Sequence, residues 1–168
     1  DGQSFSNSFQ VEVNYDISKR MDIRLAYRFL DVQKDFKVGM LSKPLLAQNK
    51  GFVNLSYETK KNDKEGQWKF DVTGQLVGEQ RIPSTSLNPI AFRVIQKSPS
   101  YILLGGQITK VISEKFEFYM GGENLTNFIQ KNPIIQAENP YGEYFDSSLI
   151  WAPVFGRMVY GGLRWTIE

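Results

Sequence analysis

Two carboxylates are the first residues in this sequence whose types and spacing could carry out chemistry. Glu117 and Glu123 lie on the same face of the extended segment FEFYMGGENL. Such a pair can serve as general acid and general base, but it needs a defined cleft and a group that positions the substrate. The 168 residues contain no Cys and no His, which removes zinc sites, thiol nucleophiles and imidazole bases. We therefore expect no enzymatic activity, no metal site and no cofactor.

A second set of candidate residues lies in long segments that contain Pro and aromatic residues. FIQKNPIIQAENPYGEYFDSSLIWAP combines rings and carboxylates that could stack on and hydrogen-bond a bulky ligand. EQRIPSTSLNPIAFR adds guanidinium groups that could meet an anionic chelate or a sugar acid. The candidate ligand-binding residues are Arg81, Arg93, Tyr141, Tyr144, Asp146 and Trp151. The alternative is a packed rim loop with solvated arginines.

Extended segments must hold these loops, because apolar and polar residues alternate through the rest of the chain. In NSFQVEVNYDI, Phe9, Val11 and Val13 fall on one face, and Gln10 and Glu12 fall on the other. The alternation recurs in MDIRLAYRF, GFVNLSYETK, WKFDVTGQL, YILLGGQITKVI, FEFYMGGENL and GRMVYGGLRWTIE. The pattern predicts an all-β protein with about seven antiparallel strands and no helix.

The connections are short after the first, third and fifth predicted strands and long after the others. The long connections cover about residues 34–50, 79–100 and 126–156. Short turns on one rim and long loops on the other are typical of an outer-membrane β-barrel, which directs apolar side chains to lipid and polar ones to the lumen. The residues then expected to face the lumen are Arg24, Arg28, Lys69, Asp71 and Glu117.

Two other architectures fit the same alternation. A soluble β-sandwich or calycin-like protein that binds a small ligand would bury the apolar face in its own core. A complete eight-stranded outer-membrane barrel would need one more strand, for which PIAFRVI within residues 79–100 is the candidate. Bacterial barrels have even strand numbers and both chain ends on the short-turn side, so about seven strands lead us to expect further strands upstream.

Two motifs follow one another in the last third of the chain. GGENLTN ends the sixth predicted strand, and GRMVYGGLRWTIE forms the seventh. Together they resemble the C-terminal end of TonB-dependent outer-membrane receptors, especially those of Bacteroidetes-type bacteria, over about residues 116–168. The matching residues are Gly122, Glu123, Asn124, Leu125, Thr126 and Asn127, then Gly156, Arg157, Tyr160, Gly162, Leu163 and Arg164.

The resemblance implies that residues 1–168 are the C-terminal part of a barrel of about 22 strands that encloses a plug domain. It implies location in the outer membrane of a Gram-negative cell and active import of a metal chelate, a corrinoid or an oligosaccharide. The implied partners are membrane lipid, the plug and remaining strands of the same chain, the TonB energy-coupling protein and the imported ligand. A formal net charge of +2 without a basic stripe gives no sign of nucleic-acid binding. The motif residues are expected to be structural.

Overall fold

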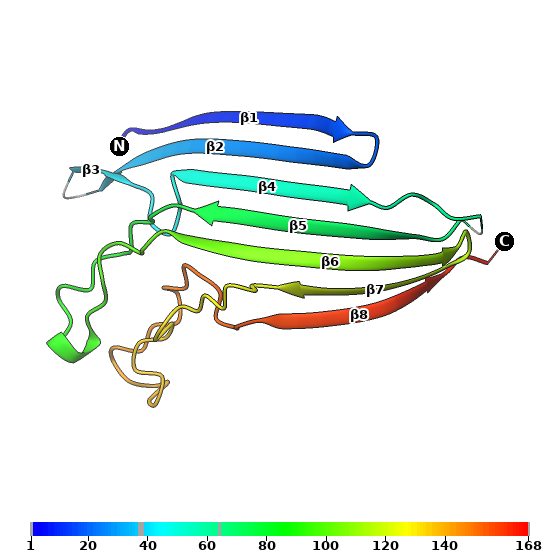
Figure 1. The fold of residues 1–168 in the computed structure, drawn as a ribbon. Coiled ribbons are helices and arrows are strands. Elements are labelled where there is room, and N and C mark those ends of the chain that lie inside the picture. Colours follow the sequence, from blue (N-terminus) through cyan, green and yellow to red (C-terminus); the bar gives the residue numbers. More distant parts are fainter. Residues whose placement is uncertain (1, 37–38, 64, 168) are drawn as a thin grey trace.

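The computed structural model describes residues 2–36, 39–63 and 65–167. They form one antiparallel sheet of eight strands in the order β1-β2-β4-β5-β6-β7-β8, with β3 paired to β2 (Figure 1). The elements are β1 (Ser4–Ser18), β2 (Met21–Phe36), β3 (Gly39–Ser42), β4 (Asn49–Glu58), β5 (Gln67–Val77), the 3-10 helix η1 (Ile90–Phe92), β6 (Tyr101–Ser113), β7 (Phe116–Glu123) and β8 (Met158–Trp165). No helix in these ranges is long and apolar enough to cross a membrane. The predicted all-β fold is confirmed.

The strand β2 is longer than the alternation indicates. The apolar alternation stops at Phe29, whereas β2 continues to Phe36 because its backbone still pairs with β1 and then with β3. Part of the expected connection 34–50 is therefore a hairpin. Residues 37–38 of that connection, Lys64 of the next turn and Glu168 of the last predicted strand lie outside the described residues.

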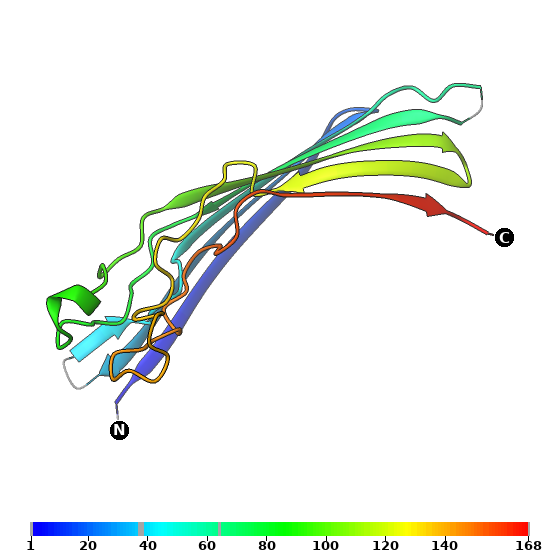
Figure 2. The same cartoon turned by 90° about the horizontal axis from the view of Figure 1, so that it is seen from below.

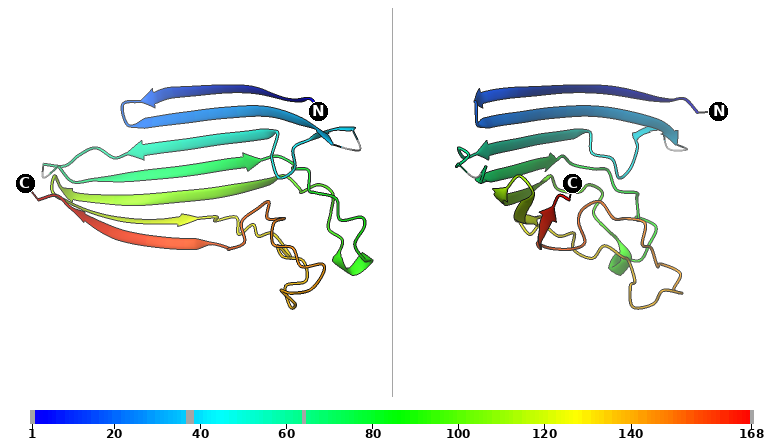
Figure 3. Two further views of the ribbon diagram at one scale, coloured as in Figure 1. Left: turned by 180° about the vertical axis from the view of Figure 1, so that it is seen from behind. Right: turned by 90° about the vertical axis from the view of Figure 1, so that its right-hand side faces the viewer.

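The additional strand does not lie where the eight-stranded barrel alternative requires it. Within residues 79–100 the segment PIAFRVI contains η1 and irregular loop, and the extra strand is β3. Among the described residues β1 and β8 are the two edges and do not pair with each other. Figures 2 and 3 show a single twisted and curved layer. A closed eight-stranded barrel therefore does not match the open sheet that the described residues form.

The pairing register gives the sheet one apolar face and one polar face. A row on the apolar face runs through Tyr15, Ile23, Leu55, Val72, Gly106, Gly122 and Val159. The next row, on the opposite face, runs through Asp16, Asp22, Ser56, Asp71, Gln107, Gly121 and Tyr160. All five residues expected to face a lumen share the polar face, since side chains alternate along each strand.

No second layer packs on the apolar face within the described residues. Tyr15 is 63% exposed, Val72 53% and Leu163 61%. A β-sandwich would cover such side chains with the inner face of another sheet. The sandwich alternative therefore does not match this single-layered arrangement.

Short and long connections lie at opposite ends of the sheet, as the sequence predicts (Figure 1). The turns β1–β2, β4–β5 and β6–β7 lie at one end, which we call the turn end. The long connections lie at the other, which we call the loop end.

In the β4–β5 turn, the side-chain hydrogen bond and charge of Glu65 raise the pKa of Lys61, whose Nζ lies 2.6 Å from the Glu65 carboxylate.

Candidate functional site

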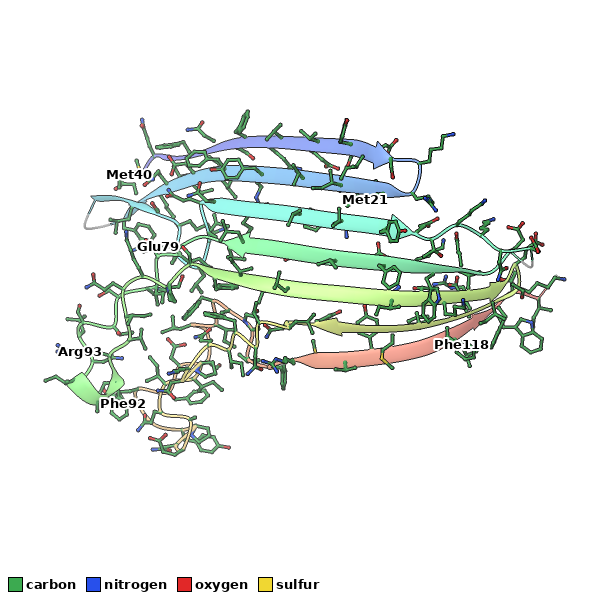
Figure 4. The ribbon with its side chains drawn as sticks, in the orientation of Figure 1. Met21, Met40, Glu79, Phe92, Arg93 and Phe118 are labelled. Atoms are coloured by element: carbon green, nitrogen blue, oxygen red, sulfur yellow. The ribbon has the colours of Figure 1, made fainter. Side chains whose placement is uncertain are left out.

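The two longest loops fold against each other at the loop end. We call residues 78–100 and 124–157 the loop lobe. Figure 4 shows Glu79 near the sheet, where the first loop begins, and Phe92 and Arg93 at η1, far from the strands. The apolar core of the loop lobe consists of buried Ile82, Ile135 and Leu149, with Phe92, Val94 and Trp151 packed against them. This cluster joins the two loops, because each loop contributes residues to it.

Two buried glutamines satisfy the backbone of the loop lobe. The Gln130 carboxamide accepts hydrogen bonds from the amides of Trp151 (2.8 Å) and Ala152 (3.2 Å), and it donates to the Leu149 carbonyl (2.9 Å). The Gln80 carboxamide donates to the Trp151 carbonyl at 2.9 Å, which links the first loop to the second. Buried backbone groups in irregular segments need such partners, because no ladder supplies them.

Arg81 links the loop lobe to the connection between β2 and β4. Its Nε donates to the Ser42 carbonyl at 2.7 Å, and its guanidinium lies over the Phe36 ring, 5.2 Å from the centroid. The Arg81 carbonyl also accepts from the Leu45 amide at 2.8 Å. Sequence reasoning assigned Arg81 to a ligand, whereas the structure shows a guanidinium engaged by neighbouring parts of the chain.

The other loop candidates divide into packed and exposed residues. Trp151 packs with Tyr101 and Phe128, and Tyr144 stacks on Phe92 with ring centroids 5.2 Å apart. Asp146 accepts from the amide and hydroxyl of Ser148, both at 2.7 Å.

Tyr141 is fully exposed at the surface of the second loop. Arg93 is exposed on the first loop, where its Nε donates to the Asn88 carbonyl at 2.8 Å. The structure therefore does not gather the six predicted ligand-binding residues around one point.

The motif residues tie the ends of β7 and β8 together. Asn124 has φ 49°, a left-handed conformation that Asn adopts more readily than most residues. Its amide donates to the carbonyls of Phe128 (2.8 Å) and Phe155 (3.1 Å), and its side-chain oxygen accepts from the Phe128 amide. Asn127 accepts from the Arg157 amide at 3.2 Å, and Arg157 Nε donates to the Leu125 carbonyl. These side chains form hydrogen bonds with the backbone at the start and at the end of the second loop.

Glycines in the motif strands make room for tyrosine rings on the polar face. A Cβ on Gly121 would lie 2.4 Å from the ring of Tyr160, and a Cβ on Gly162 would lie 2.5 Å from the Tyr119 hydroxyl. Tyr160 extends across Gly121 and donates to the Gln107 side chain at 3.1 Å. Close packing of a tyrosine ring therefore explains one glycine of each pair, Gly121 and Gly162, whereas a Cβ on Gly122 would meet the side chain of Leu125.

A cavity of about 700 Å³ opens between the two loops of the lobe. We call it the outer pocket. Its apolar lining includes Ile82, Phe92, Val94, Ile135, Leu149 and Trp151. The charged residues that line it are Arg93, Lys131 and Glu138. Of the predicted ligand-binding residues, Arg93 and Trp151 share this cavity.

A second cavity, of about 930 Å³, lies between the polar face of the sheet and the end of the second loop. We call it the inner pocket. Residues 152–156 line it together with parts of the strands β5, β6, β7 and β8. Its lining includes the carboxylates Asp71 and Glu123 and the polar side chains of Gln107 and Tyr160, without a Lys or Arg. The two pockets therefore differ in charge.

The carboxylates Glu117 and Glu123 are not brought together. Both lie on β7, where six residue steps of about 3.3 Å separate them by about 20 Å. Glu117 is paired with Arg164 of β8, and Glu123 lines the inner pocket. Across the described ranges, no group of three or more Asp and Glu side chains is arranged to hold a metal ion.

Sequence reasoning missed Phe92, Gln80, Gln130 and Lys131 as residues of the site. Apolar residues that interrupt a Pro-containing loop, as in PIAFRVI and NPII, were the available signal for a packed lobe. The glutamines carry no comparable signal, because their partners lie 19 or more residues away in the chain.

Comparisons of the chain with protein-family models, curated proteins and solved structures found no match. The structure itself shows the class of the fold: it is an all-β protein with an open antiparallel sheet and a folded loop lobe.

Proposed function

We propose that this chain forms part of the wall of an outer-membrane β-barrel of the TonB-dependent receptor class, and that its loop lobe takes part in capturing an imported ligand. The observation that carries the proposal is the continuous apolar face of the seven long strands. Lipid cannot hydrogen-bond to a backbone, so a membrane-spanning sheet pairs all its strands and turns its apolar side chains outward.

The dimensions of the apolar face support this role. On β2 the apolar alternation runs from Met21 to Phe29, nine residues, which agrees with the roughly 9–11 residues of a tilted transmembrane strand. Beyond Phe29 the same face becomes polar, and Asp31 accepts hydrogen bonds from Gln33 (2.7 Å) and Gln48 (3.2 Å). The polar network marks the level at which the strand leaves the apolar band.

Aromatic residues gather at the turn end of the apolar face. We call this cluster the turn-end belt; it consists of Tyr57, Trp68, Phe70, Phe116, Phe118 and Trp165. Lys110 lies beside this belt, with its Nζ 4.6 Å from the centroid of the Trp68 ring. Aromatic rings and snorkelling lysines are typical of the boundary between the hydrocarbon and the head groups.

A furrow in the apolar face also suits a lipid chain. It has a volume of about 420 Å³ and lies over Gly51 and Gly74, between the side chains of Val13, Leu25 and Leu76. The opposite face is polar and carries the inner pocket, in agreement with a lumen. The apolar face therefore suits lipid, and the polar face suits a lumen.

The proposed assignment to the receptor class rests on the GGENLTN and GRMVYGGLRWTIE motifs and on the loop lobe that they anchor. In this proposal the outer-membrane lipid surrounds the apolar face, and the plug and further strands of the same protein complete the barrel. The TonB protein supplies energy, and the loop lobe faces the outside of a Gram-negative cell. The chain provides binding surfaces and carries out no chemical step itself.

The proposal is tested by placing one charge on either face of β5. Val72→Arg directs a guanidinium into the proposed lipid at a cost of about 2–4 kcal/mol near the midplane, whereas Thr73→Arg directs it to the lumen. In the full-length protein we expect Val72→Arg to reduce folded receptor in the outer-membrane fraction severely, and Thr73→Arg to leave it near the wild-type level. Equal accumulation of the two variants in the outer membrane contradicts the proposal.

A further inference from the structure

The outer pocket combines an apolar wall with charged groups from both loops. All six residues of the loop-lobe core also line this cavity, so the packed core of the lobe forms its apolar wall. Arg93 comes from the first loop, and Lys131 and Glu138 come from the second. A cavity of about 700 Å³ lies within the range of small-molecule sites, which are mostly apolar with a few polar groups that fix the ligand.

The cations of the outer pocket are available to a ligand. Arg93 uses its Nε for the Asn88 carbonyl, and its two terminal amino groups have no partner in the described part of the chain. Lys131 forms no ion pair or side-chain hydrogen bond with any described residue, and neither does Glu138. The local charge is therefore +1, carried by one guanidinium and one ammonium against one carboxylate.

We propose that the outer pocket binds an amphipathic anion: a compact apolar body against Ile82, Phe92 and Trp151, with a carboxylate or similar acidic group facing Arg93 and Lys131. This inference rests on the proposed role of the loop lobe in ligand capture and names the ligand class. The terminal amino groups of Arg93 present a planar pair of donors, which matches a carboxylate. The lining of the inner pocket has two carboxylates and no Lys or Arg, so the preference for an anion belongs to the outer pocket alone.

Two dyes with one aromatic skeleton test the ligand class. Anilinonaphthalene sulfonate is an anion, and phenylnaphthylamine is its neutral counterpart. Both accept excitation from tryptophan, so transfer that disappears in Trp151→Phe reports binding next to Trp151. In the full-length protein reconstituted in lipid nanodiscs, we expect this transfer with both dyes and tighter binding of the anion.

Charge variants distinguish the anion site from a merely apolar cavity. Arg93→Gln should weaken binding of the sulfonate about tenfold, because a charge-assisted hydrogen bond contributes about 1.5 kcal/mol or more, and it should leave the neutral dye unchanged. Lys131→Gln should weaken the sulfonate less, and Glu138→Gln should strengthen its binding by removing the opposing charge. Lys97→Gln is the matched control, because Lys97 lies in the first loop outside the pocket and faces Glu79 at 3.7 Å.

Three outcomes overturn the inference. They are the absence of transfer that depends on Trp151, equal affinity for both dyes in wild-type protein, and equal losses for both dyes in Arg93→Gln. If any of them occurs in a protein that shows the contrast between Val72→Arg and Thr73→Arg, the anion site fails and the proposed membrane role stands. If that contrast is absent, the proposed function fails, whatever the dyes show.

Discussion

Gln130 binds three backbone groups with one buried side chain, and Asn124 does the same at the start of the second loop. These amides give an irregular segment the hydrogen bonds that a strand obtains from its neighbours. The sequence predicts the motif position of Asn124, but it does not predict Gln130. A glutamine in a Pro-containing loop has the same appearance whether it is solvated or buried, because its role depends on contacts distant in sequence.

Gln130→Ala should loosen the second loop without unfolding the sheet. The substitution leaves the amides of Trp151 and Ala152 and the Leu149 carbonyl without their partner, at a cost of about 1–3 kcal/mol for a buried unsatisfied group. We expect hydrogen exchange of the Trp151 and Ala152 amides to accelerate by about tenfold or more.

Gln96→Ala is the matched control for Gln130→Ala. Gln96 lies exposed in the first loop, and its side chain forms no hydrogen bond with a described residue. Exchange at Trp151 and Ala152 should remain at the wild-type rate in this control. Equal exchange rates in wild type and Gln130→Ala would show that the Gln130 carboxamide does not hold the loop.

The strands are the elements that the sequence predicts best, because each has one apolar face. All seven predicted strands are present in the sheet. Their ends are less predictable. The second strand continues past Phe29 with polar residues on its formerly apolar face, since backbone pairing with β1 does not require alternation. The sequence did not predict β3 for a different reason, because the four residues GMLS are too few to show a period.

If the sheet is a membrane wall as proposed, the turn-end belt predicts the depth of its strand ends in the bilayer. Trp68 is exposed on the apolar face beside Phe70 and Lys110, whereas Trp165 lies on the edge strand β8 and Trp151 in the loop lobe. In a Trp151→Phe and Trp165→Phe background, with any further tryptophans also replaced, Trp68 becomes the only fluorophore of its kind. We expect lipids brominated near the head group to quench Trp68 more strongly than lipids brominated near the chain end.

The opposite depth profile would place Trp68 near the bilayer midplane and contradict the belt. Quenching by neither lipid would place the ring away from lipid altogether. Lys110→Met supplies a further comparison, since it keeps an apolar contact with Trp68 and removes the charge. With the charge absent, we expect Trp68 to move toward the chain-end bromines.

The two ends of the sheet carry different features. The turn end carries the aromatic belt, and the loop end carries a folded lobe with two pockets of different charge. The sequence predicts the separation of short turns from long loops, because loop length is visible in the spacing of the strands. It does not predict the packing of the two loops, which depends on contacts such as Ile82 with Ile135 and Leu149.

The solvent exposure of neighbouring positions on β5 shows directly whether the apolar face of the sheet lies against lipid. The chain contains no Cys, so Val72→Cys and Thr73→Cys can each carry a nitroxide spin label in the full-length protein, with any cysteine elsewhere replaced. Oxygen concentrates in lipid hydrocarbon, and a nickel chelate stays in water. We predict that the label at position 72 collides mainly with oxygen and the label at position 73 mainly with the nickel chelate. A label at position 72 that is shielded from both reagents, or that is as open to the nickel chelate as the label at position 73, would contradict a lipid-facing sheet.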